Sequence, residues 1–198
     1  MPRPSNTAQR RREITAALIE VMAERGYEGA STQAVADAAG LSPGLVHYHF
    51  AAKREILVAA VEALVEGVQR RYAARREGAA SARAELDAFV DAHLALGDDA
   101  DPEAVAAWVV IGTTALHDEV VGHVYAEAIE GRVREAEARL RAAAQADGYR
   151  SRSMRRQAAA LVAAIEGYYR LSAAVPSVIP SGSAAKMVRA MIDGLLAS

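Results

Sequence analysis

The stretch STQAVADAAGLSPGLVHYHF, residues 31–50, has the residue pattern of two short helices joined by a tight turn. Ser31 is a favourable N-cap for a first helix, and Gly40 is placed to end it in the left-handed conformation. Ser42 and Pro43 supply an N-cap and a first-turn proline for a second helix. The stretch therefore predicts a helix-turn-helix.

Apolar side chains of the two short helices are spaced to pack against each other. Val35 and Ala36 on the first helix are expected to meet Val46 and Phe50 on the second. This packing leaves one face of the second helix, residues 43–49, toward solvent, where it can enter a groove of DNA. The same spacing also occurs at a tight corner in an ordinary helical bundle.

The residues on that outward face are of types that contact DNA. Gly44 allows close approach, and Leu45 can touch a thymine methyl group. His47 and Tyr48 can donate to phosphates, while Gln33 either reads adenine or binds phosphate. Hydroxyls and free N–H groups at the helix N-termini also suit phosphate oxygens. The predicted DNA contacts are Thr32, Gln33, Ser42, Pro43, Gly44, Leu45, His47, Tyr48 and Lys53.

A basic arm precedes this motif in a chain whose formal net charge is −2. Its charged residues are Arg3, Arg10, Arg11, Arg12 and Glu13. Two interpretations stay open: a solvated tail, or an arm that neutralises phosphates beside a DNA-reading module.

Helical periodicity continues through nearly the whole chain. One apolar stripe comprises Ile14, Ala17, Leu18, Val21 and Met22, and Gly26 is expected to end that helix in the left-handed conformation. Later helices are expected over residues 53–72, 86–94, 101–117, 118–146, 153–174 and 183–197, with a solvated charged face at 132–141. No alternating strand pattern appears, so we predict an all-α fold of about nine helices.

Composition and missing motifs exclude several classes of protein. The chain has no cysteine, which excludes disulfides, zinc–thiolate sites and thiol redox sensing. No apolar run approaches the ~18 residues of a membrane span, and no secretory signal is present, so a cytoplasmic protein is expected. No phosphate-binding glycine loop or G-x-S-x-G is present, and we expect neither an enzyme nor a cofactor. A small all-α enzyme is kept only as a remote alternative.

The run from Arg11 to Leu57 resembles the DNA-binding domain of the TetR (tetracycline-repressor) family of bacterial regulators. The resembling residues are Gly26-Tyr27, Val35-Ala36, Ala39-Gly40-Leu41-Ser42, Gly44, His49-Phe50, Lys53 and Leu57. The resemblance implies a homodimeric repressor that binds a palindromic operator and is released by a small-molecule effector. It implies DNA contacts at Thr32, residues 43–47, Tyr48 and Lys53. Two departures are His47, where the family usually has Tyr, and Gln33, where it often has a basic residue.

The family's domain organisation implies a DNA-binding domain at residues 8–68 and a ligand-binding and dimerisation domain at residues 69–198. Residues 86–196 resemble the sensor region of the choline-responsive repressor BetI, through Trp108, residues 132–140 and the AAIEG segment at 163–167. The last two helices are the expected dimer interface, with other faces of the same helices in the intramolecular core.

A ligand pocket is expected among the middle helices. Its candidate lining residues are Phe89, His93, Trp108, His117, Tyr125, Glu166 and Tyr169. Each aromatic residue can instead be core. Glu166 lies in an apolar helix, where an unpaired carboxylate is costly, so it either binds a cationic or hydroxylated ligand or pairs with an Arg or Tyr.

Histidines and acids in the same region raise the alternative of a metal-responsive regulator. The residues concerned are His93, His117, His123, Asp91, Asp118 and Glu119. No two of these histidines have the i, i+4 spacing of a helical zinc motif, so no metal ligand is predicted.

Overall fold

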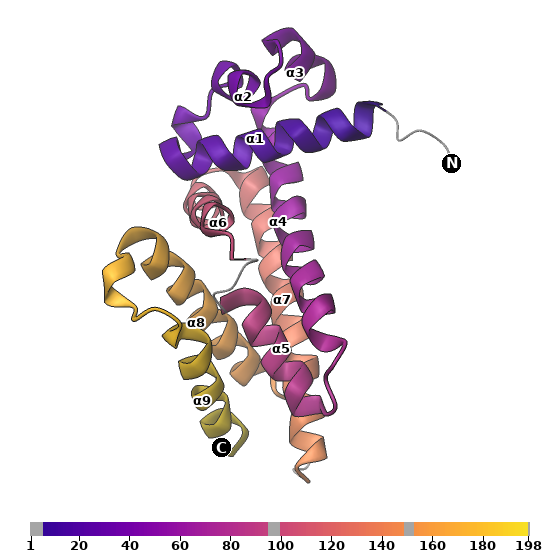
Figure 1. Cartoon of the computed structure of the whole chain (residues 1–198), viewed down its shortest axis with the longest axis vertical. Helices are drawn as coiled ribbons and strands as arrows, with labels where there is room; N and C mark the ends of the chain where they lie inside the picture. Colours follow the sequence, from indigo (N-terminus) through magenta and orange to yellow (C-terminus); the bar gives the residue numbers. More distant parts are fainter. Residues whose placement is uncertain (1–5, 95–99, 149–152, 198) are drawn as a thin grey trace. The chain divides into compact units, whose positions relative to one another are not determined.

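The structure is a computed structural model that describes residues 6–94, 100–148 and 153–197, and it is shown in Figure 1. Within these ranges it contains nine α-helices, one short 3-10 helix and no strand, which confirms the predicted all-α fold. The helices are α1 (Asn6–Gly29), α2 (Thr32–Ala39), α3 (Pro43–His49), α4 (Lys53–Arg76), α5 (Ala82–Leu94), α6 (Pro102–Thr114), α7 (Glu119–Ala146), α8 (Arg155–Ala174), η1 (Pro176–Val178) and α9 (Ser183–Ala197).

The chain divides into two compact units. Unit 1 comprises Met1–Val65 and Asp101–Ala126, and unit 2 comprises Glu66–Ala100 and Glu127–Ser198. Helix α6 therefore belongs to the same unit as the helix-turn-helix, although it is distant from that motif in the sequence, and it packs against α1. The sequence predicted a boundary at residue 68 between a DNA-binding and a ligand-binding domain. That boundary divides the chain by function rather than by packing, and it stays a prediction.

The core of unit 1 forms around the apolar stripe of α1. Ile14, Leu18 and Met22 are fully buried, and α1 packs against α2, α3 and α6. Val46 and Phe50 are also buried, at 1% and 2% exposure, so the inward face of the helix-turn-helix is closed as predicted.

The regular part of α1 ends at a kink at Gly26, the residue predicted to end this helix. Gly26 has φ 69° and ψ 177°, a conformation open to glycine but not the left-handed helical one, and the chain continues in one further turn to Gly29. The predicted positive φ and the helix end at Gly26 are thus present, while ψ differs from the left-handed helical value and a further turn follows the kink. The added turn leads directly to the N-cap Ser31.

Unit 2 contains α5, α8 and α9 together with parts of α4 and α7. Its largest fully buried side chains are Phe89, Leu86, Leu140, Leu161 and Ile165. Helix α9 packs on both α5 and α8, and two ion pairs of 2.5 Å, Arg83–Asp193 and Arg189–Asp91, also join α9 to α5.

The charged segment 132–141 of α7 is not a solvated face, contrary to the prediction. Arg132 is only 8% exposed, and Leu140 is fully buried. The helical period brings these positions to the inner side of α7, and the long apolar stem of arginine packs well there.

Across the described residues, no helix has both the length and the hydropathy required to span a membrane.

Candidate DNA-binding and effector-binding residues

Local capping interactions define the helix-turn-helix. The Ser31 hydroxyl accepts from the Ala34 N–H at 3.1 Å, and the Ser42 hydroxyl accepts from the Leu45 N–H at 3.3 Å. Gly40 adopts φ 64° and ψ 33°, the left-handed conformation that the sequence predicted. These caps satisfy backbone groups at both helix starts and turn the chain sharply between α2 and α3.

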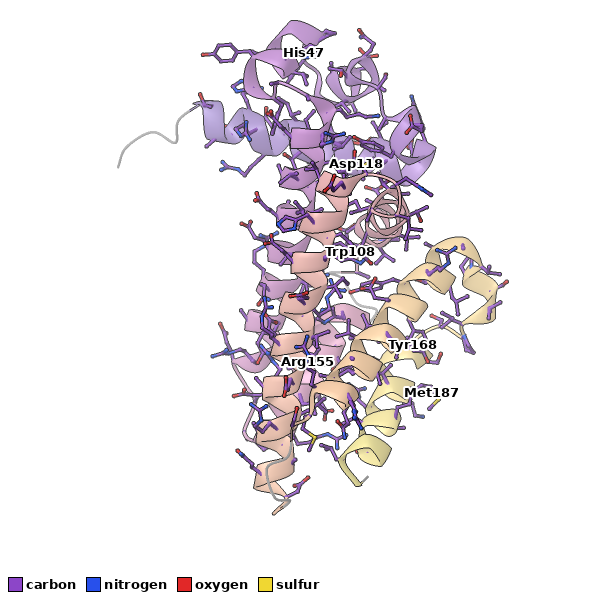
Figure 2. The ribbon with its side chains drawn as sticks, turned by 180° about the vertical axis from the view of Figure 1, so that it is seen from behind. His47, Trp108, Asp118, Arg155, Tyr168 and Met187 are labelled. Atoms are coloured by element: carbon purple, nitrogen blue, oxygen red, sulfur yellow. The ribbon has the colours of Figure 1, made fainter. Side chains whose placement is uncertain are left out.

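The outward face of α3 carries the residues that the sequence placed there. Tyr48 is 78% exposed, and His47, labelled in Figure 2, is also exposed on this short helix. Pro43 and Leu45 are half-buried. Nothing lies within 4 Å of the position that a Cβ would take at Gly44, so no contact inside this chain requires glycine there. The missing side chain instead leaves room for an external surface to approach α3.

The two predicted DNA-contacting residues of α2 differ in burial and in their contacts within the chain. Thr32 is half-buried at the first position of α2. Gln33 is exposed, and its Nε2 donates to Oδ1 of Asp37 at 2.7 Å. The side chain of Gln33 thus lies along α2 in this conformation.

Lys53 begins α4 and contacts Tyr27 rather than projecting freely into solvent. Its Nζ donates to the Tyr27 carbonyl at 2.8 Å and lies 3.9 Å from the centroid of the Tyr27 ring. The sequence did not reveal this partner, because Tyr27 and Lys53 are 26 positions apart. Burial is the main factor that raises the pKa of Tyr27.

The arginines of the N-terminal arm have different roles. Arg10 forms a 2.7 Å ion pair with Glu13. Arg11 donates from Nη1 to the carbonyl of His49, and its guanidinium lies 3.8 Å from the centroid of the Phe50 ring. Arg12 is exposed, and Arg3 lies outside the described residues. Arg11 therefore connects α1 to the C-terminal end of α3.

Four of the predicted pocket residues meet in unit 2. Phe89 and His93 have ring centroids 4.6 Å apart, and His93 Nδ1 lies 2.8 Å from the Phe89 carbonyl. Glu166 forms an ion pair with Arg132, whose guanidinium lies 5.9 Å from the Tyr169 ring centroid. Glu166 thus has the arginine partner that one of the two sequence interpretations required.

Two of these groups are uncharged at neutral pH. Burial, with a further contribution from Arg132, lowers the pKa of His93 to about 3. Burial also raises the pKa of Tyr169 to about 12. The positive charges in this part of unit 2 therefore come from arginine alone.

The other three predicted pocket residues belong to unit 1. Trp108 and Tyr125 have ring centroids 5.1 Å apart. Gly112 makes room for Tyr125, because a Cβ there would lie 3.0 Å from the tyrosine hydroxyl. His117 is exposed on the turn between α6 and α7. The predicted set of seven is therefore divided between two compact units.

Sequence reasoning missed Arg71 and Arg139, which also lie in unit 2. Arg71 Nε donates to the Ala92 carbonyl at 2.9 Å, and the Arg139 guanidinium lies 4.2 Å from the Tyr72 ring centroid. A usable signal was present for Arg139, which follows Arg132 at i+7 on the inner stripe of α7.

In the part of the chain that the structure describes, no three His, Asp or Glu side chains are grouped to hold a metal ion.

Two family models match the chain. Residues 14–60 match the bacterial regulatory proteins of the tetR family, and residues 82–197 match the BetI-type transcriptional repressor, C-terminal. The HTH-type transcriptional regulator BetI of Rhizobium meliloti (strain 1021) is 28% identical over 121 residues, which cover 61% of this chain and 59% of that protein. The chain thus spans less than two thirds of that relative's length.

Solved structures show the same fold. A putative TetR-family regulator from Rhodococcus sp. superposes with a TM-score of 0.82 at 26% identity, covering 96% of this chain and 99% of that one. A putative regulator from Saccharomonospora viridis, solved in complex with choline, has a TM-score of 0.76 at 22% identity and covers 96% of each chain. With one model on the helix-turn-helix and another on more than half of its length, the chain belongs to the TetR family of bacterial regulatory proteins.

Proposed function

We propose that this chain is a transcriptional repressor that binds a palindromic DNA operator through α3 and is released by a small-molecule effector. The observation that carries the proposal is the capped helix-turn-helix, whose α3 is closed on its inner face and exposes Gly44, His47 and Tyr48 on its outer face. Membership of a family of regulators supports the same function and argues against an enzyme. Such a repressor acts in the cytoplasm, where bacterial DNA lies.

We further propose that the repressor is a homodimer formed through α8 and α9. Large apolar side chains remain exposed along the end of α8, η1 and α9: Leu171, Val175, Val178, Met187 and Met191. Figure 2 labels Tyr168 of α8 and Met187 of α9, which mark this pair of helices. A second copy of the chain would bury these side chains in a four-helix interface, and its two-fold symmetry matches a palindromic operator.

Within unit 1, an ion pair joins the corner between α6 and α7 to the first turn of α4. Asp118 accepts from the backbone N–H groups of Val120 and Val121, and Arg54 binds the same carboxylate at 2.9 Å. The start of α4 follows α3 directly, so this corner is suited to transmit an effector-induced shift to α3. Coupling of about 1–3 kcal/mol between the two sites is typical of such regulation.

The test is an electrophoretic shift assay with the full chain and DNA from upstream of its own gene. Tyr48→Ala should weaken binding about tenfold, because the side chain is exposed and its removal leaves the core intact. Glu130→Ala is the control: the Glu130 side chain is 63% exposed on α7 in unit 2, and its removal should change the affinity less than about twofold.

Transcription of the same template in vitro then separates the modes of action. Repression requires that the wild-type chain lowers transcript yield and that Tyr48→Ala restores it. An increase in transcript would replace the repressor assignment with that of an activator. Absence of a shifted band at low salt with wild-type protein would refute DNA binding at this site.

A further inference from the structure

Three arginines converge in the interior of unit 2. We call Arg71 of α4 and Arg132 and Arg139 of α7 the arginine cluster. Arg132 is 8% exposed, and the Arg139 side chain is 15% exposed. Arginine is rarely buried to this extent without a functional or structural counterpart, because removing its charge from water is costly.

Aromatic rings line the same place. The Arg139 guanidinium lies 4.2 Å from the Tyr72 ring centroid and 5.1 Å from that of Phe89. Arg132 lies near Tyr169, at 5.9 Å from its ring centroid. Cation–π contacts of this kind partly offset the desolvation of guanidinium groups, but they supply no negative charge.

Two of the arginines contact the α5 segment that carries His93: Arg71 donates to the Ala92 carbonyl, and the Arg139 guanidinium lies 5.1 Å from the ring centroid of Phe89, which contacts His93. Burial is the main cause of the lowered pKa of His93, and the positive charges of all three arginines lower it further. The protonated form of His93 is therefore excluded from a region that is already positive.

Negative charge around the arginine cluster is incomplete. Glu166 pairs with Arg132, and the nearest Glu135 carboxylate oxygen lies 3.8 Å from Arg139. Arg71 makes no ion pair with any carboxylate in the described part of the chain. The Nε of Arg139 is buried and has no hydrogen-bond partner. A buried donor without a partner, next to an excess of positive charge, indicates a missing anion.

We propose that the effector of this regulator is a small organic anion, whose acidic group binds Arg71 and Arg139 while its apolar body contacts Tyr72, Phe89 and Tyr169. The planar guanidinium group is well matched to carboxylate and phosphate oxygens. The arginine cluster repels a quaternary ammonium such as the choline bound by the Saccharomonospora viridis regulator. This inference rests on the proposed function and specifies the chemical class of the effector.

The test is isothermal titration calorimetry of the full chain with four probes: sodium benzoate, sodium octanoate, inorganic phosphate and choline chloride. We expect a carboxylate probe to bind and choline to give no heat above dilution. Phosphate separates recognition of the anionic group alone from recognition that also needs the apolar body. Binding of choline with no binding of any anion would overturn the proposal.

Variants assign the binding to the arginine cluster. Arg71→Ala should weaken carboxylate binding at least about tenfold. Arg70→Ala is the matched control, because Arg70 is the next residue but is 73% exposed and pairs with Glu66 at the surface; it should have less than about a twofold effect. Glu166→Gln should tighten carboxylate binding, since it removes a negative charge beside the arginine cluster that repels the bound anion. A purely structural arginine cluster would predict no tightening.

Two further measurements keep the result interpretable. If Arg71→Ala unfolds, Arg71→Lys retains the charge but loses the planar fork, and it should still weaken carboxylate binding measurably. The DNA shift assay is run on the same ligand-free protein. Operator binding without anion binding would refute this inference and leave the proposed repressor function intact. Anion binding without operator binding would refute the proposed repressor function and leave the anion site intact.

Discussion

Replacing Glu166 by leucine should destabilise unit 2 strongly. The side chain of Arg132 is 7% exposed and that of Glu166 is 24% exposed. Removing one partner of a buried ion pair typically costs about 3–5 kcal/mol, because the remaining charge loses its counter-charge where water cannot replace it. Glu166 keeps some contact with solvent, so we expect the lower end, about 3 kcal/mol.

Urea denaturation followed by circular dichroism at fixed protein concentration measures this effect. The matched control is Glu130→Leu, which breaks the ion pair between Glu130 and Arg134 on α7, the helix that also carries Arg132. Because both side chains of this pair are 63% exposed, Glu130→Leu should lower the free energy of unfolding by less than about 1 kcal/mol. The double variant Arg132→Met/Glu166→Leu should recover most of the loss, since two packed apolar side chains replace two buried charges. A Glu166→Leu protein as stable as the Glu130→Leu protein would refute the reasoning.

Three further predictions concern local interactions. Ser31→Ala removes the N-cap of α2 and should lower the free energy of unfolding by about 1 kcal/mol in the same urea assay. Arg12→Ala should reduce the slope of log affinity against log salt concentration by about 0.9 if Arg12 neutralises one phosphate. Arg11→Ala removes the hydrogen bond from Arg11 to the His49 carbonyl of α3, so it should weaken operator binding with an unchanged slope. His93 has a pKa of about 3 when folded, below its unfolded value, so stability is fully present above pH 6.5 and falls as the pH drops. Between pH 7 and pH 5 the loss should be about 2 kcal/mol, and His93→Gln should flatten this part of the pH profile.

Capping residues made the DNA-binding half of the chain predictable from its sequence. The interactions of Ser31, Gly40 and Ser42 span only three or four positions, so their geometry depends little on the rest of the fold. Asp101 caps α6 in the same way, accepting from the Ala104 N–H at 2.8 Å. Gly26 was less predictable, because its positive φ is compatible with either a helix end or a kink.

The proposed effector region was only partly predictable, for two physical reasons. A hydrophobic pattern assigns arginine to solvent, so Arg132 and Arg139 were expected on an exposed face, although both face aromatic rings. The placement of Trp108 and Tyr125 in a different compact unit from Phe89 was not predictable. Packing with α1 places α6 in unit 1, and no short-range pattern reports that contact.

The contacts of Lys53 favour its predicted role in DNA binding rather than excluding it. An ammonium group has three donors, and the Tyr27 carbonyl takes only one of them. The Tyr27 ring beside Nζ restricts the otherwise flexible side chain of Lys53. Part of the conformational entropy that Lys53 would lose on binding DNA is therefore already lost in the free protein. The cation is therefore fixed at the first residue of α4, directly after α3, where the proposed contact with a DNA phosphate requires it. Tyr27→Ala should weaken operator binding while leaving the Lys53 charge in place, which separates preorganisation of the cation from its charge alone.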